Sequence, residues 1–134
     1  MHSFALMIWT FACTEIEPTH SFQGKDFILD SAEGYTPIGD EILLSFSTTT
    51  ETFVFDAGCN RYDATYTYDN SFFDVISISG TEMSCDTDLM EQDAWFVDFL
   101  TYYPTLTHED DRLILEFIDD NHSTPDIKLI FVEN

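Results

Sequence analysis

Basic residues are scarce in this sequence. Its 134 residues include 26 Asp and Glu against four Lys and Arg, which gives a formal net charge of -22. Nucleic-acid binding and docking on anionic lipid both depend on clustered Lys or Arg, so neither kind of partner is expected. Because the acidic residues are spread along the whole chain, we interpret them as a solvated acidic surface. A surface that binds a cation or a basic partner is the alternative.

Several signatures of catalysis and metal binding are also missing. The three cysteines form no C-x-x-C pair, so a thioredoxin-like redox site is not indicated. No G-x-S-x-G sequence marks a nucleophilic serine, and the acid-rich segments lack the spacing of a calcium-binding loop. His108 and His122 fall in segments predicted as turns, where we expect them to be solvated. We therefore predict that the protein is not an enzyme and has no cofactor and no metal site.

The apolar run near the N-terminus, residues 4–12, is too short to cross a bilayer as an ordinary helix. It suits the h-region of a secretory leader, and the Cys13 that follows resembles the lipid-attachment site of bacterial lipoproteins. We expect residues 1–23 to form a leader and tether, with Cys13 acylated, and residues 24–134 to form the folded domain. The membrane would then be contacted only through this lipid anchor. An ordinary N-terminal strand or a truncated start is the alternative interpretation.

Short runs of alternating apolar residues dominate the rest of the chain. With 44% hydrophobic residues, including 13 Phe, a folded chain is expected despite the charge. The alternation predicts eight short strands, over residues 26–30, 41–47, 52–56, 65–68, 72–78, 105–107, 112–118 and 127–132. Short turns between them favour sequential antiparallel pairing. Leu43, Val54, Ile76 and Ile130 lie on the face opposite the main apolar set, so we predict a bent sheet or barrel-like meander that buries both faces.

One helix is predicted over residues 87–102, with Pro104 as its stop signal. Leu89, Phe96, Leu100 and Tyr103 fall on one face of that helix, which should pack on the sheet. Asp88 and Glu91 have the spacing of a capping box. The predicted fold class is therefore mainly β, or α+β, with a single helix.

The most specific pattern lies in residues 53–93. A strand-like run ends in Gly58-Cys59-Asn60, because Gly and Asn tolerate backbone angles that strands do not use. A hairpin with Tyr66 near its start follows, then a T-x-M-x-C sequence, and then the helix with one acidic residue on its apolar face. The residues of this pattern are Gly58, Cys59, Asn60, Tyr66, Thr81, Met83, Cys85 and Asp93.

This pattern resembles the META domain, also called the HslJ-like family. The chain departs from the family pattern at Ala64, Ser84 and Asp93, where Gly, Ala and Glu are usual. The resemblance implies a barrel-like fold and a cell-envelope setting in an oxidising compartment. It also implies a context of heat shock and antibiotic resistance, but no catalytic mechanism.

Cys59 and Cys85 lie at corresponding strand ends, 26 positions apart. We predict a structural disulfide between them, with two buried free thiols as the alternative. In the hairpin between the two cysteines, a turn centred on Asn70 would place Tyr66 opposite Asp74. That pairing brings both cysteines to the same end of the sheet.

Asp93 follows Leu89 by four positions and precedes Phe96 by three, so its carboxylate should point with the apolar face. A buried carboxylate needs hydrogen-bond donors. We expect these from backbone N–H groups or hydroxyls of residues 58–60 or 81–85, in a structural role. Trp95 and Phe99 lie on another face of the helix, as further core or as an exposed aromatic patch.

Two main functional hypotheses follow. The first is a monomeric, non-enzymatic envelope lipoprotein domain that acts through contacts with another envelope protein in stress or antibiotic tolerance. The second is a small module that binds an apolar ligand or lipid inside the curved sheet. A packed interior would favour the first and a large apolar cavity the second. A thiol enzyme using Cys59 or Cys85 is a third hypothesis.

Overall fold

The computed structural model describes residues 19–39, 41–123 and 125–134. Cys13 and the predicted leader lie outside these residues. The strands are β1 (Asp26–Glu33), β2 (Leu43–Phe46), β3 (Thr52–Asp56), β4 (Arg61–Asp69), β5 (Phe72–Gly80), β6 (Thr105–Glu109), β7 (Arg112–Phe117) and β8 (Ile127–Glu133), and the helix is α1 (Thr87–Thr101).

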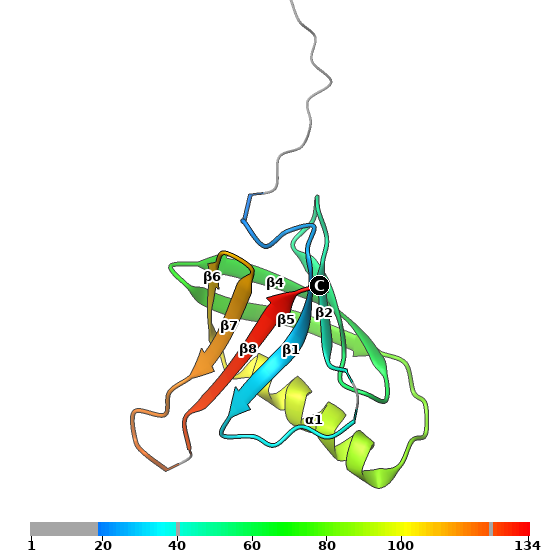
Figure 1. Cartoon of the computed structure of the whole chain (residues 1–134). Helices are drawn as coiled ribbons and strands as arrows, with labels where there is room; N and C mark the ends of the chain where they lie inside the picture. The colour runs from blue at the N-terminus through cyan, green and yellow to red at the C-terminus, as the bar shows by residue number, and fades with distance from the viewer. Residues whose placement is uncertain (1–18, 40, 124) are drawn as a thin grey trace, which may run out of the picture.

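The eight strands form a closed, ring-like antiparallel sheet in sequence order (Figure 1). Each strand pairs with the next, and β8 returns to pair with β1, with Phe131 opposite Leu29. The predicted mainly-β fold with one helix in the described residues is confirmed. Most strands are longer than the apolar alternation indicated, because polar residues at their ends continue the backbone pairing.

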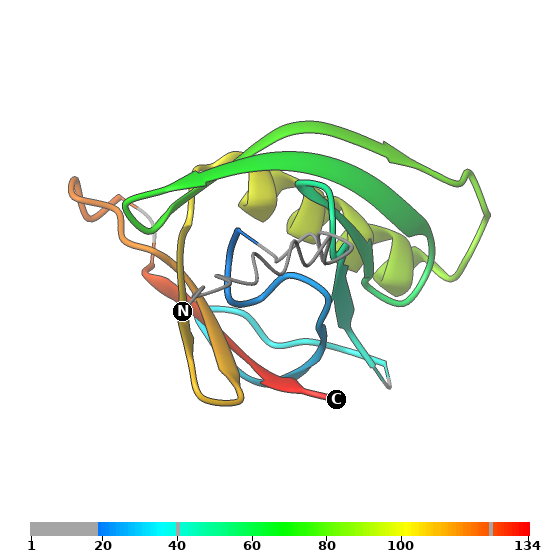
Figure 2. The ribbon, with the colours of Figure 1, turned by 90° about the horizontal axis from the view of Figure 1, so that it is seen from above.

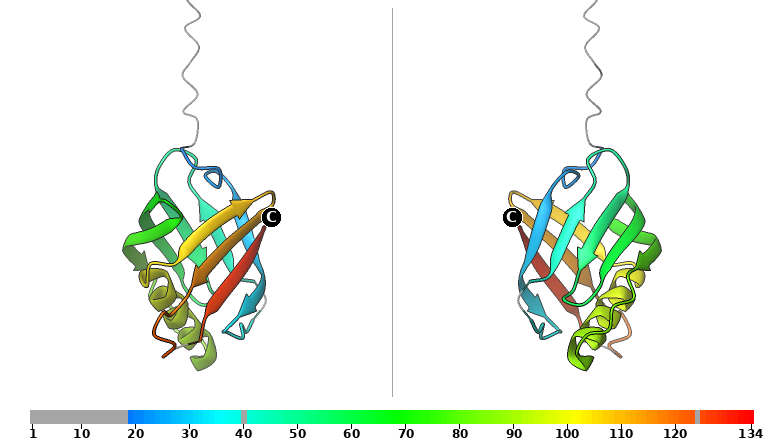
Figure 3. Two further views of the ribbon diagram at one scale, coloured as in Figure 1. Left: turned by 90° about the vertical axis from the view of Figure 1, so that its left-hand side faces the viewer. Right: turned by 90° about the vertical axis from the view of Figure 1, so that its right-hand side faces the viewer.

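The ring is weakest between β5 and β6. These strands share a single residue pair, Phe72 with Thr105, whereas β4 and β5 pair along their whole length. Helix α1 packs beside β5 and covers one of the two open ends of the ring (Figure 3). The segment of residues 19–25 lies across the opposite end, as the view down the ring shows (Figure 2). Both openings are therefore covered by the chain itself.

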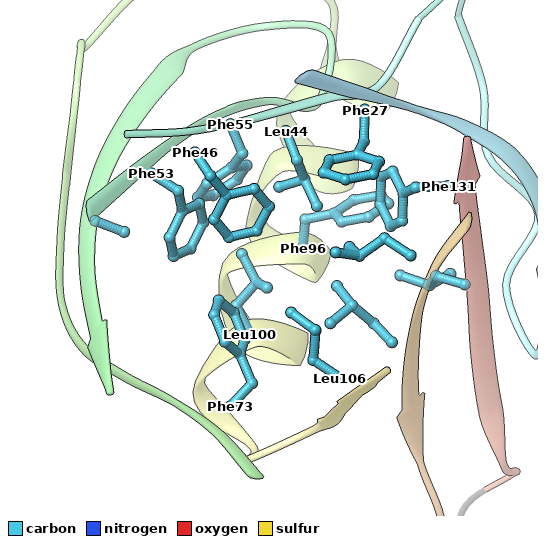
Figure 4. Close-up of a cluster of buried hydrophobic side chains, with 14 of the residues drawn as sticks. Phe27, Leu44, Phe46, Phe53, Phe55, Phe73, Phe96, Leu100, Leu106 and Phe131 are labelled. Carbon is cyan, nitrogen blue, oxygen red and sulfur yellow. The ribbon is translucent and has the colours of Figure 1, made fainter. Parts of the chain in front are cut away.

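Aromatic side chains fill the interior. Phe53, Tyr66 and Phe73 meet with ring centroids 5.1–5.9 Å apart, within the range preferred by aromatic pairs. Figure 4 shows the phenylalanines of the strands converging on Phe96 and Leu100 of the helix. Phe22, only 1% exposed, belongs to the same core. The folded part therefore includes residues before Gly24, where we had expected it to begin.

The outward-facing apolar residues are not buried, contrary to our expectation. Ile76 is 63% exposed, and Leu43, Val54 and Ile130 are half-buried on the outer face. Successive side chains of a strand point to opposite sides, so closing the sheet encloses only one face of each strand. One helix is too small to cover the other face.

The β4–β5 hairpin differs from the predicted register. Its loop contains two residues, Asn70 and Ser71, both with positive φ, of 49° and 69°, as in the two-residue turns that match strand twist. This turn pairs Tyr66 with Val75 and not with Asp74, and a bulge between Thr65 and Tyr66 then adds a further shift, so that Ala64 pairs with Ile78 and not with Ile76. Hence the cysteines still reach the same end of the sheet, by a different register.

The predicted helix over residues 87–102 agrees with α1, but the predicted capping box and the predicted position of Tyr103 were wrong. The N-cap residue is Asp86, and its side chain makes no capping hydrogen bond, so Asp88 and Glu91 do not form a capping box. Tyr103 lies beyond the last helical residue with φ of 57° and is 65% exposed. It therefore does not share the packed face, and Leu89 is only half-buried.

Candidate functional site

The sequence motif folds into one cluster where β3 ends, β4 begins and α1 starts. We call it the motif cluster: Gly58, Cys59, Asn60, Thr81, Met83, Cys85 and Asp93. Three kinds of link hold it together, namely a disulfide, a side-chain amide and a buried carboxylate. Each link joins segments that are distant in the sequence.

Gly58 makes the sharp turn between β3 and β4. Its φ is 111°, in the region that side chains with a Cβ rarely adopt. A Cβ at this position would lie 3.0 Å from Cδ2 of Leu89. The Gly58 N–H donates to the carboxylate of Asp56 at 2.8 Å. Both the backbone angle and the close approach of the helix therefore require glycine here.

Cys59 and Cys85 form the predicted disulfide, with their Cα atoms 5.9 Å apart. This distance is typical of protein disulfides. The bond joins the β3–β4 turn to the segment that leads into α1. Neither sulfur is a thiol in this arrangement, so the thiol-enzyme hypothesis has no nucleophile here.

Asn60 clamps the T-x-M segment through its side-chain amide. Its Oδ1 accepts from the Thr81 hydroxyl at 2.9 Å and from the Met83 N–H at 2.7 Å. Its Nδ2 donates to the Met83 carbonyl at 3.4 Å. The Met83 side chain itself is exposed, so Met83 contributes to the cluster through its backbone.

Asp93 connects the helix to the turn. It is 2% exposed, and its carboxylate accepts from the N–H groups of Cys59 at 3.3 Å and Asn60 at 2.7 Å. The Tyr62 hydroxyl donates to it at 3.2 Å. Burial and the neighbouring Asp93 carboxylate raise the pKa of Tyr62, which keeps that hydroxyl protonated as a donor. The donors are those expected from the sequence, with Tyr62 in addition.

Gln92 is a buried polar residue that was not predicted from the sequence. Its Nε2 donates to the carbonyls of Ala57 at 2.6 Å and Ile38 at 2.9 Å, and its Oε1 accepts from the Ile38 N–H at 2.7 Å. It thereby holds the loop after β1 against the β3 end. Its position, three residues after Leu89 and four before Phe96, was the signal for an inward side chain.

Tyr66, the hairpin aromatic of the pattern, lies away from the motif cluster. It is buried in the core beneath Phe22. Its hydroxyl has no hydrogen-bond partner among the described residues. Burial, with the charge of Glu51, raises the pKa of Tyr66, so this hydroxyl is always protonated under ordinary conditions.

His108 lies in β6, not in a solvated turn as predicted. Its ring packs against Phe27 with centroids 5.6 Å apart, and its Nδ1 lies 2.7 Å from Oγ of Ser21. Burial and the nearby Lys25 charge lower the pKa of His108. A neutral imidazole beside a hydroxyl resembles part of a nucleophilic site. However, Nε2 is buried without a partner in the described chain, so no carboxylate orients this ring. His122 is exposed, as expected.

Trp95 and Phe99 belong partly to the core and partly to the surface. Phe99 is buried, whereas Trp95 is half-buried between Tyr35, at 3.8 Å, and Phe99, at 5.4 Å between ring centroids. Of the two interpretations open from the sequence, further core therefore applies to both residues, because Trp95 also packs against the core.

The motif cluster offers structural links and not reactive groups. The part of the chain that the structure describes contains no group of three or more His, Cys, Asp and Glu residues placed to hold a metal ion. Among the same residues, no helix has the length and apolar character needed to cross a membrane. What the arrangement does is fix the start of α1 against the β3–β4 turn.

Comparisons with known proteins identify the fold and the family. The chain is similar to a protein from Burkholderia xenovorans solved by NMR, with 18% identity, a TM-score of 0.64, and coverage of 84% of this chain and 83% of that one. A second NMR structure matches with 20% identity, a TM-score of 0.60, and coverage of 82% and 89%. At these identities the likeness concerns the fold alone. The search of curated proteins found no match. The family model of the META domain matches residues 20–125, which include strands β1 to β7, the motif cluster and the helix. The chain therefore belongs to the META domain family.

Proposed function

We propose that this protein is a non-enzymatic, envelope-located META domain that acts by binding another protein. The observation that carries the proposal is an exposed apolar surface at one edge of the ring. Four large side chains there, each 57–65% exposed, form what we call the aromatic rim: Phe72, Tyr102, Tyr103 and Ile118.

The four residues of the aromatic rim come from elements that adjoin in space. Phe72 begins β5 and pairs with Thr105, which in turn pairs with Glu116 near the end of β7. The ring of Tyr102, at the end of α1, contacts Phe117 at 5.9 Å between centroids. Grouped exposed apolar side chains on a soluble domain commonly mark a protein-contact surface.

The packed interior supports protein contacts over the alternative of a ligand carrier. A carrier needs a cavity inside the curved sheet, yet the side chains of both strand and helix meet at its centre (Figure 4). Helix α1 and residues 19–25 cover the two ends of the ring and so close the path of a ligand to the interior.

The envelope setting is supported by the disulfide, because such bonds persist in oxidising compartments. Lipid attachment at Cys13 would tether the domain there. Intact-mass analysis of the protein from its native host decides this point. A mature chain that begins at Cys13 with added acyl mass is expected, and a chain that begins at Met1 with unmodified Cys13 contradicts it.

Capture from envelope extract tests the protein-contact proposal. The full chain is compared with a variant carrying Phe72→Ser, Tyr102→Ser and Ile118→Ser, all at exposed positions. The extract is kept at high salt so that the charge of -22 does not retain basic proteins unspecifically. Ile76→Ser is the matched control, since Ile76 is equally exposed but lies outside the aromatic rim.

We expect a discrete protein to be retained by the natural chain and by the Ile76→Ser control but lost by the rim variant. Circular dichroism of each variant ensures that the fold is intact. If all three chains retain the same proteins, the aromatic rim is not the contact surface.

A further inference from the structure

A second surface feature lies between α1 and the ends of β7 and β8. It is a pocket of about 490 Å³, within the size range of small-molecule sites. Trp95, Asp98, Phe99 and Tyr102 form its helical wall, because spacings of three and four residues place them on one helix face. Phe117, Pro125 and Ile127 line it from the other side, with Gly34.

The lining is aromatic and aliphatic apart from one charged group, Asp98. Asp98 is exposed, and none of the four basic residues of the chain lines the pocket. The nearest basic residue in sequence, Lys128, follows Ile127 in β8 and therefore points to the opposite face of the sheet. Its register partner on β7 is Glu116. An anionic ligand such as a carboxylate or phosphate would meet only negative charge in this pocket.

We propose that this pocket binds a hydrophobic organic cation, meaning an ammonium group that carries an aromatic or branched alkyl substituent. The apolar part would pack on Tyr102, Phe117 and Ile127. The ammonium group would lie at Asp98 and against the aromatic faces, which attract cations through their quadrupole. The net charge of -22 raises the local concentration of such cations around the whole domain.

A neutral apolar ligand fits the pocket less well, because covering Asp98 would remove water from its carboxylate without supplying a partner. A cation replaces that water with an opposite charge. Tyr102 belongs both to this pocket and to the aromatic rim, so a protein bound at the rim and a ligand in the pocket would compete for this side chain.

Fluorescence of Trp95 reports on the pocket directly. The chain has two tryptophans, and the other is Trp9, so the full chain with Trp9→Phe gives a signal from Trp95 alone. The probe is benzyltrimethylammonium. It is compared with its neutral isostere neopentylbenzene and with the anion phenylmethanesulfonate.

We expect the cation to change the fluorescence of Trp95 saturably, with a dissociation constant in the millimolar range. The neutral isostere should bind more weakly, and the anion should cause no change. Asp98→Asn should weaken binding of the cation about three- to fivefold, the contribution of one partly exposed ion pair. It should leave the affinity for the neutral isostere unchanged. Tyr102→Ala should weaken both. Asp98 and Tyr102 are exposed, so these variants keep the fold.

Asp63→Asn is the matched control, since it removes the same charge from an exposed position on β4 outside the pocket. If Asp63→Asn weakens binding of the cation as much as Asp98→Asn does, the attraction is a general one to an acidic surface. That result would overturn the proposed site. Equal affinity for the neutral isostere would overturn the ligand class. Absence of titration, together with a dimer mass in solution, would mean that a second copy covers the pocket and would also overturn the proposal.

Discussion

Asp93 gives the sharpest test of how the motif cluster stabilises the fold. In Asp93→Asn the side chain keeps its shape but has one acceptor oxygen in place of two. If that oxygen stays with Asn60 and Tyr62, the amide NH₂ faces the Cys59 N–H, and one buried donor is left unpaired. Hydrogen bonds to a charged group contribute about 1.5–3 kcal/mol each, and an unpaired buried donor costs about 1–3 kcal/mol.

We therefore expect Asp93→Asn to lower the free energy of unfolding by about 3 kcal/mol, and the melting temperature by about 10 °C for a domain of this size. Urea unfolding without reductant is the assay, because the disulfide must stay intact. Asp98→Asn is the matched control on the same helix, since Asp98 is exposed, and it should change stability by no more than about 0.5 kcal/mol.

Asp93→Glu separates charge from fit. Glutamate keeps both acceptor oxygens but adds a methylene in a buried site, so a smaller loss of about 1–2 kcal/mol is expected. The reasoning is refuted if Asp93→Asn is as stable as the Asp98→Asn control, since the buried carboxylate would then contribute nothing that an amide cannot supply.

Four further predictions rest on other parts of the structure. Tyr66→Phe should leave the free energy of unfolding unchanged or raise it by up to about 1 kcal/mol, because the lost hydroxyl is buried without a partner among the described residues; a clear loss in urea unfolding would reveal a partner. Replacing both Cys59 and Cys85 by Ser should cost about 3.5 kcal/mol, the loop-entropy value for a separation of 26 residues, and an unchanged urea midpoint would contradict it. The pKa of His108 is lowered on folding, so the contribution of this residue to stability is fully present above the pKa of the unfolded state and is lost as pH falls through the pKa of the folded state. Between about pH 7.5 and about pH 5, the free energy of unfolding should therefore fall less for His108→Gln than for the natural chain. An equal fall in both chains would contradict this role of His108. Added salt should raise the melting temperature, because it screens the repulsion of a chain with net charge -22; a melting temperature independent of salt would oppose this.

The sequence allowed prediction of the features that local rules determine. Alternation of apolar residues located the strands, as in β3, whose bounds Thr52–Asp56 were predicted residue for residue. The Cys59–Cys85 pair followed from two cysteines at strand ends, and the donors to Asp93 followed from a carboxylate on an apolar helix face. The strand and helix signals depend on neighbours along one element, whereas the cysteine pair also depends on the hairpin that lies between the two strand ends.

Features that depend on distant segments were missed. The partner of His108 is Ser21, 87 positions away, and nothing near either residue indicates that they meet. The segment that contains Phe22 looked like a polar tether, because most of its residues are polar. Its burial depends on the open end of the ring, which exists only once β8 pairs with β1. The exposure of Ile76 has the same origin, because closure of the sheet decides which face is inside.

The central claim, that the aromatic rim contacts another protein, is tested most directly by photo-crosslinking in the native host. Tyr102 is replaced with p-benzoylphenylalanine, which keeps an aromatic side chain at an exposed position, and Ile76 is replaced in the same way as a control outside the rim. Irradiation followed by immunoblotting and mass spectrometry identifies the adducts. We predict a discrete adduct with one envelope protein from position 102 and none from position 76. No adduct from position 102, or the same adducts from both positions, would contradict the claim.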